Sequence, residues 1–388
     1  MKARTKSLFT LALLSLILLG LPLIGVAVTG GPVAAYLEFP PQTRFVEQAP
    51  FSWGGFVLMG LISGFLFGAL IWLLQPWRRD LSRAEPRRHG FPWWGWVGAV
   101  WLVLAWGLAW SPLNQRWGLA SYSFTAIWIG YIVVANALTW HRSGRSLLSH
   151  RPARLLILFP FSAVFWWYFE YLNRFVQNWH YLGIASGSAT SYVVHASLAF
   201  ATVLPALVST MDLLKSFPRL RETRHTRGFP TVDPRRLAWA SLAIGALGLL
   251  GIGIWPNQLY ALVWAAPVVV LLALQTLIGT RTCLHPVRQG RWEPVALPAL
   301  AALACGLLWE MWNVYSSPKW IYSVPYVDRF EIFEMPLLGY TGYLPFGIAC
   351  AVFADFALRM VQGASGPVLD RPERVPHREA GGQRLIRR

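Results

Sequence analysis

Three glutamates, Glu170, Glu310 and Glu334, are the side chains best placed for chemistry, because they lie at or near the ends of long apolar segments. A carboxylate at such a depth is costly unless it is paired or hydrated, and an ionisable group inside a membrane segment indicates a functional site by default. We predict that Glu310 and Glu334 are catalytic acids, while Glu170 belongs to a ligand-binding set.

Two of these glutamates belong to a motif that occurs twice. The motif is an aromatic residue followed by Glu, two further residues and Asn, and then by Trp-x-Tyr. Its copies are Phe169, Glu170, Asn173, Trp179 and Tyr181, and Trp309, Glu310, Asn313, Trp320 and Tyr322. Because Glu and Asn three residues apart share one face of a helix, each copy should present a carboxylate beside an amide.

The predicted binding site joins the two copies through their polar and aromatic side chains. We expect its members to be Glu170, Asn173, Asn313, Trp309, Trp312, Trp320 and Tyr322. Trp309 and Trp312 flank Glu310 and would form an aromatic wall around a long apolar ligand. The Glu/Asn pairs would then hold the head of that ligand.

An alternative interpretation gives the same residues a structural role. The tryptophans would form the aromatic belt that anchors helix ends at a membrane interface. Glu170 would form a local ion pair with Arg174, and Glu310 would pair with Lys319 or Arg329. In that case the motif stabilises the fold and binds no ligand.

Glu334 has no acidic counterpart in the first copy, where Val193 and Val194 occupy the corresponding positions. An acid that only one copy carries indicates that the two copies have diverged in role. The carboxylates near the motifs could offer oxygens to a divalent cation, but no Asp-rich loop or fixed ligand spacing accompanies them. We therefore predict neither a metal site nor a cofactor.

The composition indicates a membrane protein with many spans. Of 388 residues, 55% are hydrophobic and only 13% are charged, which is too little charge to cover a soluble protein of this length. The apolar residues fall in runs of about 20, the length that crosses a bilayer. The net charge of +17 lies between these runs, whereas a nucleic-acid-binding domain concentrates its charge on a soluble face. We predict no nucleic-acid partner.

These runs predict an all-α, polytopic bundle of about ten transmembrane helices. The expected spans are 7–29, 51–75, 93–113, 120–140, 155–175, 189–213, 237–256, 258–280, 294–315 and 336–360. With this arrangement, 28 of the 34 lysines and arginines fall on the side of the two termini, which the positive-inside rule identifies as the cytoplasm. We expect a bacterial inner membrane protein with both termini cytoplasmic.

The first two spans carry two further expectations. The run that follows Met1 also resembles a signal peptide, although its length favours a retained span. Gly60, Gly64 and Gly68 are spaced by four residues, a pattern that lets a helix approach its neighbour closely.

Sequence markers repeat at a nearly constant distance. Besides the motif copies, Pro205 and Pro345 recur at the same spacing and in the same order, as expected of an internal duplication. We predict a tandem four-helix repeat in parallel orientation, with a pseudo-two-fold axis along the membrane normal. The predicted domains are an N-terminal transmembrane hairpin, 1–75, a first repeat, 76–213, a second repeat, 214–360, and a basic cytoplasmic tail, 361–388.

The stretch that follows the second motif, Phe330-Glu331-Ile332-Phe333-Glu334-Met335-Pro336-Leu337 together with Trp320 and Tyr322, resembles the integral-membrane lycopene cyclase domain family. In that family an acidic residue precedes a Trp-x-Phe stretch, an apolar-Pro-Leu-Glu-Glu motif opens a membrane helix, and duplicated units occur. Here Leu338-Gly339 stand in place of the two glutamates. The resemblance implies that Glu310 and Glu334 protonate a polyene. A divergent multi-pass bacterial membrane family is the alternative.

Three functions fit this reading. The first is binding, with or without chemical modification, of an isoprenoid, carotenoid or other lipid at the extracytoplasmic leaflet. The second is a non-catalytic structural or assembly subunit of a membrane complex with membrane-protein partners. The third is a transporter, whose site should lie near mid-membrane. The depth of Glu170 and Glu310, near the outer interface, disfavours the third and leaves open whether the protein is an enzyme.

Overall fold

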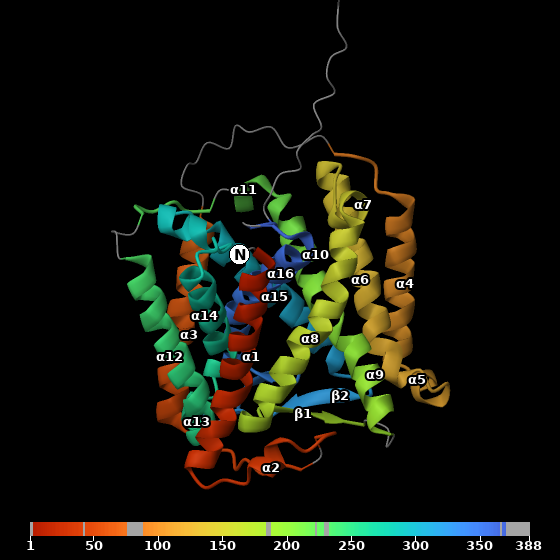
Figure 1. The fold of residues 1–388 in the computed structure, drawn as a ribbon. Helices are drawn as coiled ribbons and strands as arrows, with labels where there is room; N and C mark the ends of the chain where they lie inside the picture. The colour runs from red at the N-terminus through yellow and green to blue at the C-terminus, as the bar shows by residue number, and fades with distance from the viewer. Residues whose placement is uncertain are drawn as a thin grey trace, which may run out of the picture.

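The computed structural model describes residues 3–41, 43–75, 88–183, 188–221, 223–228, 233–364 and 367–369. Within them, long apolar helices run side by side between two ends of a bundle (Figure 1). These helices are α1 (Ala3–Val28), α3 (Trp53–Leu74), α4 (Trp93–Ala109), α6 (Ala120–Ser143), α8 (Pro152–Val176), α9 (Ala189–Phe200), α10 (Val203–Lys215), α12 (Pro234–Ile254), α14 (Leu262–Leu277), α15 (Glu293–Asn313) and α16 (Tyr343–Gln362).

Short elements connect the long helices at both ends. At the end that carries the strands, called the strand end below, lie α2 (Val33–Tyr36), α5 (Leu113–Arg116), α13 (Pro256–Leu259), β1 (Trp179–Leu182) and β2 (Lys319–Tyr322) (Figure 1). The remaining short elements are α7 (Leu147–His150), α11 (Pro218–Arg221), η1 (His285–Gln289), β3 (Glu331–Ile332), β4 (Met335–Pro336) and η2 (Leu337–Gly342). Helices α7 and α11 lie at the opposite end (Figure 1).

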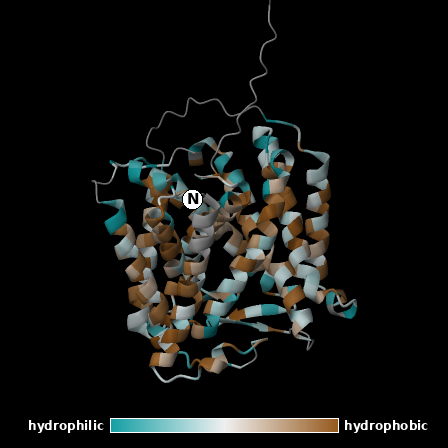
Figure 2. Cartoon of the chain, viewed as in Figure 1, coloured by the Kyte–Doolittle hydropathy of each residue, from teal (hydrophilic) through white to brown (hydrophobic). Residues whose placement is uncertain are grey.

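Length and composition indicate a membrane protein. In the described part of the chain, seven helical segments are long and apolar enough to cross a bilayer: Trp53–Leu74, Ala120–Ser143, Pro152–Val176, Ala189–Lys215, Pro234–Ile254, Glu293–Asn313 and Leu337–Gln362. Three shorter apolar helices accompany them, Ala12–Val28, Trp93–Ala109 and Leu262–Leu277. Hydrophobic residues cover the helices along the bundle, and hydrophilic residues gather toward its ends (Figure 2).

Local sequence signals start and stop these helices. Ser52 and Ser188 accept hydrogen bonds from the backbone amides of the first turns of α3 and α9, which satisfies donors that a helix start leaves unpaired. Gly144 and Gly363 end α6 and α16 in the left-handed conformation, which glycine adopts without steric cost.

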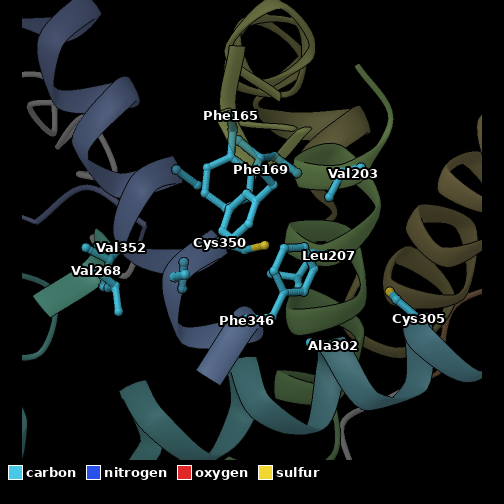
Figure 3. Close-up of a cluster of buried hydrophobic side chains, with 14 of the residues drawn as sticks. Phe165, Phe169, Val203, Leu207, Val268, Ala302, Cys305, Phe346, Cys350 and Val352 are labelled. Atoms are coloured by element: carbon cyan, nitrogen blue, oxygen red, sulfur yellow. The ribbon is translucent and has the colours of Figure 1, made fainter. Parts of the chain in front are cut away.

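The buried core lies where helices from the two halves of the chain meet. Helix α10 packs against α6, α8 and α15, while α16 packs against α14, α15 and α8. Phe165 and Phe169 of α8, Leu207 of α10, and Phe346 and Cys350 of α16 converge there (Figure 3). Because this cluster joins both halves, the protein folds around one shared core.

Close helix approach occurs at different glycines from those expected. A Cβ placed at Gly60, Gly64 or Gly68 would meet no atom within 4 Å, so that expectation is wrong. Instead, a Cβ at Gly25 of α1 would lie 2.2 Å from a carbonyl oxygen of α12, and one at Gly253 would lie 2.2 Å from a carbonyl oxygen of α1. These two glycines let α1 and α12 touch backbone to backbone.

The all-α expectation misses four short strands. β1 and β2 form an antiparallel pair in which Trp179 lies opposite Tyr322 and Tyr181 lies opposite Trp320. β3 and β4 form a second antiparallel pair. Each β1–β2 strand holds the Trp-x-Tyr part of one motif copy, so the two copies are hydrogen-bonded to each other at the strand end.

The described residues between α1 and α3, 29–41 and 43–52, form a strap across the strand end (Figure 1). Gln177 Oε1, next to α8, accepts the backbone amides of Phe45 at 2.9 Å and Val46 at 2.8 Å. Asn257 of α13 accepts the amide of Ala49 at 3.1 Å through Oδ1. The strap is therefore fixed to both halves of the chain.

Candidate functional site

Each motif asparagine fixes the turn from a long helix into a strand. Asn173 donates from Nδ2 to the carbonyl of Trp179 at 2.7 Å, and its Oδ1 accepts the amide of Asn178 at 2.9 Å. Asn313 donates to the carbonyl of Trp320 at 2.7 Å and accepts the amide of the same residue at 2.9 Å. The asparagines thus satisfy backbone groups where the chain enters β1 and β2, and hold each strand against the end of its helix.

The first motif glutamate, Glu170, anchors three aromatic side chains. Its Oε1 accepts hydrogen bonds from Trp166 Nε1 at 2.9 Å, Trp179 Nε1 at 3.0 Å and Tyr181 OH at 2.6 Å. The residue is buried. One carboxylate oxygen therefore sets the orientation of two indoles and one phenol, and hydrogen bonds to an acid are stronger than those to neutral acceptors.

The second motif glutamate, Glu310, anchors two phenols. Its Oε1 accepts from Tyr322 OH at 2.7 Å and from Tyr343 OH at 2.8 Å, while Trp320 Nε1 donates to Tyr322 OH at 2.8 Å. Glu310 is fully buried, and its Oε2 has no hydrogen-bond partner among the described residues. A buried polar atom without a partner requires an explanation, such as a catalytic role or an unseen ligand.

Tyrosines that bond to these acids keep their protons. Burial, followed by the nearby Glu310 charge, raises the pKa of Tyr322 in β2 well above its usual value. Burial and Glu170 likewise raise the pKa of Tyr181 in β1. Both hydroxyls therefore act as donors to the carboxylates throughout the physiological pH range.

The local ion pairs of the alternative interpretation do not form. Arg174 pairs with Glu38 of the strap at 3.3 Å. Lys319 Nζ pairs with Glu334 Oε1 at 2.5 Å, and the Arg329 guanidinium lies 4.2 Å from the centroid of an aromatic ring. The hydrogen-bond partners that hold both motif carboxylates are neutral indoles and phenols, so that part of the alternative is wrong.

The described bond of Glu334 is to a lysine and not to either motif copy's carboxylate. Glu334 sits between β3 and β4 and is bound to Lys319 of β2. Its side chain is partly buried, with 19% exposed. The structure therefore gives Glu334 an ion pair with Lys319 and leaves its catalytic role a prediction.

A cavity of about 750 Å³ lies between the two motif copies. Aromatic residues from both halves form much of its wall, namely Phe124, Trp166, Trp179, Tyr181, Phe200, Trp264, Trp309, Trp320, Tyr322, Tyr343 and Phe346. Pro40 and Pro41 of the strap contribute to the wall at the strand end. This volume is within the range of about 300–1,000 Å³ that small-molecule sites occupy.

The cavity divides the predicted site residues into two groups. Trp309, Asn313, Trp320 and Tyr322 line it. The remaining predicted residues, Glu170, Asn173, Glu310, Trp312 and Glu334, are not part of its lining. The motif acids instead stand one side chain behind the wall, because the tyrosines and tryptophans that they accept from form it.

Sequence reasoning missed several lining residues. Trp179 and Tyr181 stand at the positions of Trp320 and Tyr322 in the repeated motif, so the motif contained the signal for them. Tyr343 and Trp264 lie outside the motif, and nothing in their local sequence indicates a cavity. Packing between helices that are distant in the sequence brings these two residues to the cavity.

Metal-binding chemistry has no visible basis in this site. Within the described ranges, no group of three or more His, Cys, Asp or Glu side chains is arranged to hold a metal ion. Cys283, Cys305 and Cys350 are buried and unbridged, as expected of small apolar core residues.

Comparisons of the chain with protein-family models, with curated proteins and with solved structures return no match. The resemblance to the lycopene cyclase domain family therefore rests on the short stretch around Glu334 alone.

Proposed function

We propose that this protein binds an isoprenoid, carotenoid or other lipid in the cavity between the motif copies, at the extracytoplasmic leaflet. The observation that carries the proposal is the aromatic wall, which both copies build and which the buried Glu170 and Glu310 hold in position. Rings fixed by hydrogen bonds offer flat apolar surfaces at low entropic cost. Such a wall suits a long, flat or methyl-branched apolar ligand.

The membrane arrangement belongs to the same proposal. We infer ten passes, made of the seven long segments and the three shorter apolar helices, with both termini in the cytoplasm of a bacterial inner membrane. The excess of lysine and arginine in the connections opposite the strand end supports this orientation. It puts the strand end, and with it the cavity, on the extracytoplasmic side.

The tandem repeat is supported by equivalent contacts. Helices α4 and α12 each pack on the next long helix, α6 and α14, and the motif asparagines make matching bonds to β1 and β2. The β1–β2 register also pairs Trp179 with Tyr322 and Tyr181 with Trp320, as a two-fold axis through the ladder requires. Residues 370–388 of the proposed tail lie outside the described residues.

Chemical modification of the ligand would use Glu310, whose Oε2 is buried without a partner. Tyr322 or Tyr343 would connect Glu310 to the ligand, because each is bonded to Glu310 and lines the cavity. In such a step the phenol would give its own proton to the ligand and take one from protonated Glu310, which leaves the phenol neutral and the carboxylate charged. The resemblance-based role of Glu334 as a second acid remains part of this proposal.

The test is to purify the protein in mild detergent and to identify bound lipids and pigments by mass spectrometry and absorbance. Binding predicts an enriched isoprenoid or other specific lipid in stoichiometric amount. Ala199→Trp should fill the cavity and displace it, because Ala199 lines the wall. Leu198→Trp is the matched control, since Leu198 is exposed on the same helix and is not a lining residue. Only bulk phospholipid in the wild-type protein would contradict the proposal.

A further inference from the structure

The cavity wall lacks permanently charged side chains among the described residues. Its described lining residues include no Lys, Arg, Asp or Glu. The polar groups that they offer are serine and tyrosine hydroxyls, indole nitrogens, the Asn313 amide and the His195 imidazole. A ligand in this cavity must therefore find its polar contacts among hydroxyl, indole, amide and imidazole groups.

Two cations that flank the motif copies are engaged in ion pairs. Arg174 is paired with Glu38 and Lys319 with Glu334, and neither Arg174 nor Lys319 lines the cavity. Glu170 and Glu310 stand behind the wall, bonded to residues that form it. A phosphate or carboxylate head would have to be buried without a counter-charge, and an unpaired buried charge costs several kcal/mol.

A polar edge lies where α6 and α9 approach each other. Its members, Ser121, Ser191, Tyr192 and His195, all line the cavity. The Ser191 hydroxyl lies 3.2 Å from His195 Nδ1, and the ring of Tyr122 lies 4.9 Å from the imidazole. Imidazole and hydroxyl groups can each donate or accept, so this edge suits an alcohol or a carbonyl.

The polar edge lies close to the outer surface of the bundle. Tyr122 of α6 and Val194 and Leu198 of α9 are exposed, and in a membrane these faces meet lipid. Small lining residues, Ala120 and Ala196, stand beside the edge. A lipid could therefore place its head at the polar edge and its body against the aromatic wall without crossing a charged surface.

We propose that the ligand is an uncharged lipid with a hydroxyl or carbonyl head, bound by the polar edge of α6 and α9, and that the cavity excludes phosphorylated lipids. This inference rests on the proposed lipid-binding function and names the class of lipid. The neutral lining and the Ser191–His195 pair together carry it.

The experiment is a competition measured by native mass spectrometry on the full-length protein in detergent. The two probes, geranylgeraniol and geranylgeranyl monophosphate, are offered at equal concentrations. They differ only in the charge and size of the head. We expect the alcohol complex to exceed the phosphate complex by about tenfold or more. Leaving one charge unpaired or losing one hydrogen bond costs at least the free energy of a tenfold change in affinity. Equal occupancy, or a preference for the phosphate, would overturn the inference.

Two variants locate the effect. His195→Ala should weaken alcohol binding by about tenfold through the lost hydrogen bond and leave the weak phosphate binding unchanged. Ser121→Arg puts a cation into the wall and should raise phosphate occupancy relative to the alcohol. Thr190→Arg is its control, because Thr190 is an exposed α9 residue outside the lining. If Thr190→Arg raises phosphate occupancy as much as Ser121→Arg does, the charge of the wall is not what selects the head, and the inference fails.

The outcomes separate this inference from the proposed function. A preference for phosphate together with a specific co-purified lipid refutes the neutral head but keeps lipid binding. Absence of binding by both probes, together with only bulk phospholipid in the purified protein, refutes both.

Discussion

At the end of α8, Glu170 accepts hydrogen bonds from Trp166, Trp179 and Tyr181, whereas at the end of α15 Glu310 accepts from Tyr322 and Tyr343. The asparagines beside them make the same backbone contacts in both copies. The two motif copies therefore share the turn into the strand and differ in the set of donors around the acid.

The change in donors is a reciprocal exchange of large and small residues. At the repeat spacing, Trp166 corresponds to Gly306 and Val203 corresponds to Tyr343. A Cβ on Gly306 would lie 2.5 Å from the Tyr343 ring. Tyr343 therefore occupies, beside Glu310, the room that the missing Gly306 side chain leaves, and it supplies the donor that Trp166 supplies to Glu170. Trp166 donates to Glu170 from the same helix, α8, whereas Tyr343 donates to Glu310 from a neighbouring helix, α16.

The largest difference between the copies should follow removal of the acids. Glu170→Leu leaves three buried donors without an acceptor and Glu310→Leu leaves two, and each orphaned donor costs about 1–3 kcal/mol. Thermal unfolding in detergent, followed by tryptophan fluorescence, should show the greater loss for Glu170→Leu. The glutamine variants keep an acceptor oxygen and serve as controls. An equal loss for both leucine variants would contradict the different donor sets.

The exchange of large and small residues can be tested by a double-mutant cycle. Gly306→Trp alone should destabilise the protein by roughly 3 kcal/mol or more, because its side chain collides with Tyr343 and overpacking is costly. Adding Tyr343→Val makes the second copy resemble the first and should recover part of that loss. The apparent melting temperatures of the two single variants and the double variant measure the coupling. Strictly additive losses would show that the positions are not exchanged partners.

The asparagines should behave alike, in contrast to the acids. Asn173→Ala and Asn313→Ala each remove a side chain that satisfies both a backbone carbonyl and a backbone amide. We expect each to lower stability by about 2 kcal/mol. The aspartate variants keep the acceptor oxygen and should lose less. Melting temperatures that differ widely between Asn173→Ala and Asn313→Ala would break the equivalence of the two turns.

The smallest expected effect concerns Glu334, which only the second copy carries. Its ion pair with Lys319 is partly exposed, and such pairs contribute about 0–1 kcal/mol. Glu334→Gln and Lys319→Gln should therefore change stability little and by similar amounts. Cellular lipid and carotenoid profiles distinguish a catalytic role, because only Glu334→Gln would then remove a product. Unchanged profiles in Glu334→Gln and in Glu310→Gln would exclude acid catalysis by either residue.

The sequence predicted those features that depend on local composition and on repetition. Long apolar runs identified a membrane protein, and the repeated motif identified the helix ends at which Glu170 and Glu310 lie. Of the predicted ligand-binding residues, Trp309, Trp320 and Tyr322 line the cavity, whereas Trp312, the other predicted wall residue, does not. These inferences rest on spacing along one helix or on similarity between two segments, and a linear sequence contains both.

Features that depend on contacts between distant segments were not predictable in the same way. The Trp-x-Tyr segments are only four residues long as strands, too short for alternation to reveal them. Arg174 has a motif acid one helical turn away, yet it pairs with Glu38 of the strap. The donor from Tyr343 arrives from another helix, so nothing near Glu310 in the sequence announces it.

The β1–β2 ladder and the strap also limit how the molecule can move. The ladder joins the two halves edge to edge at the strand end, and the strap is bonded to Gln177 in one half and to Asn257 in the other. Rocking of one half against the other would have to break these bonds together. Alternating access by such rocking is therefore disfavoured. We expect any bound molecule to enter and leave the cavity laterally, from the bilayer, while the strand end stays closed.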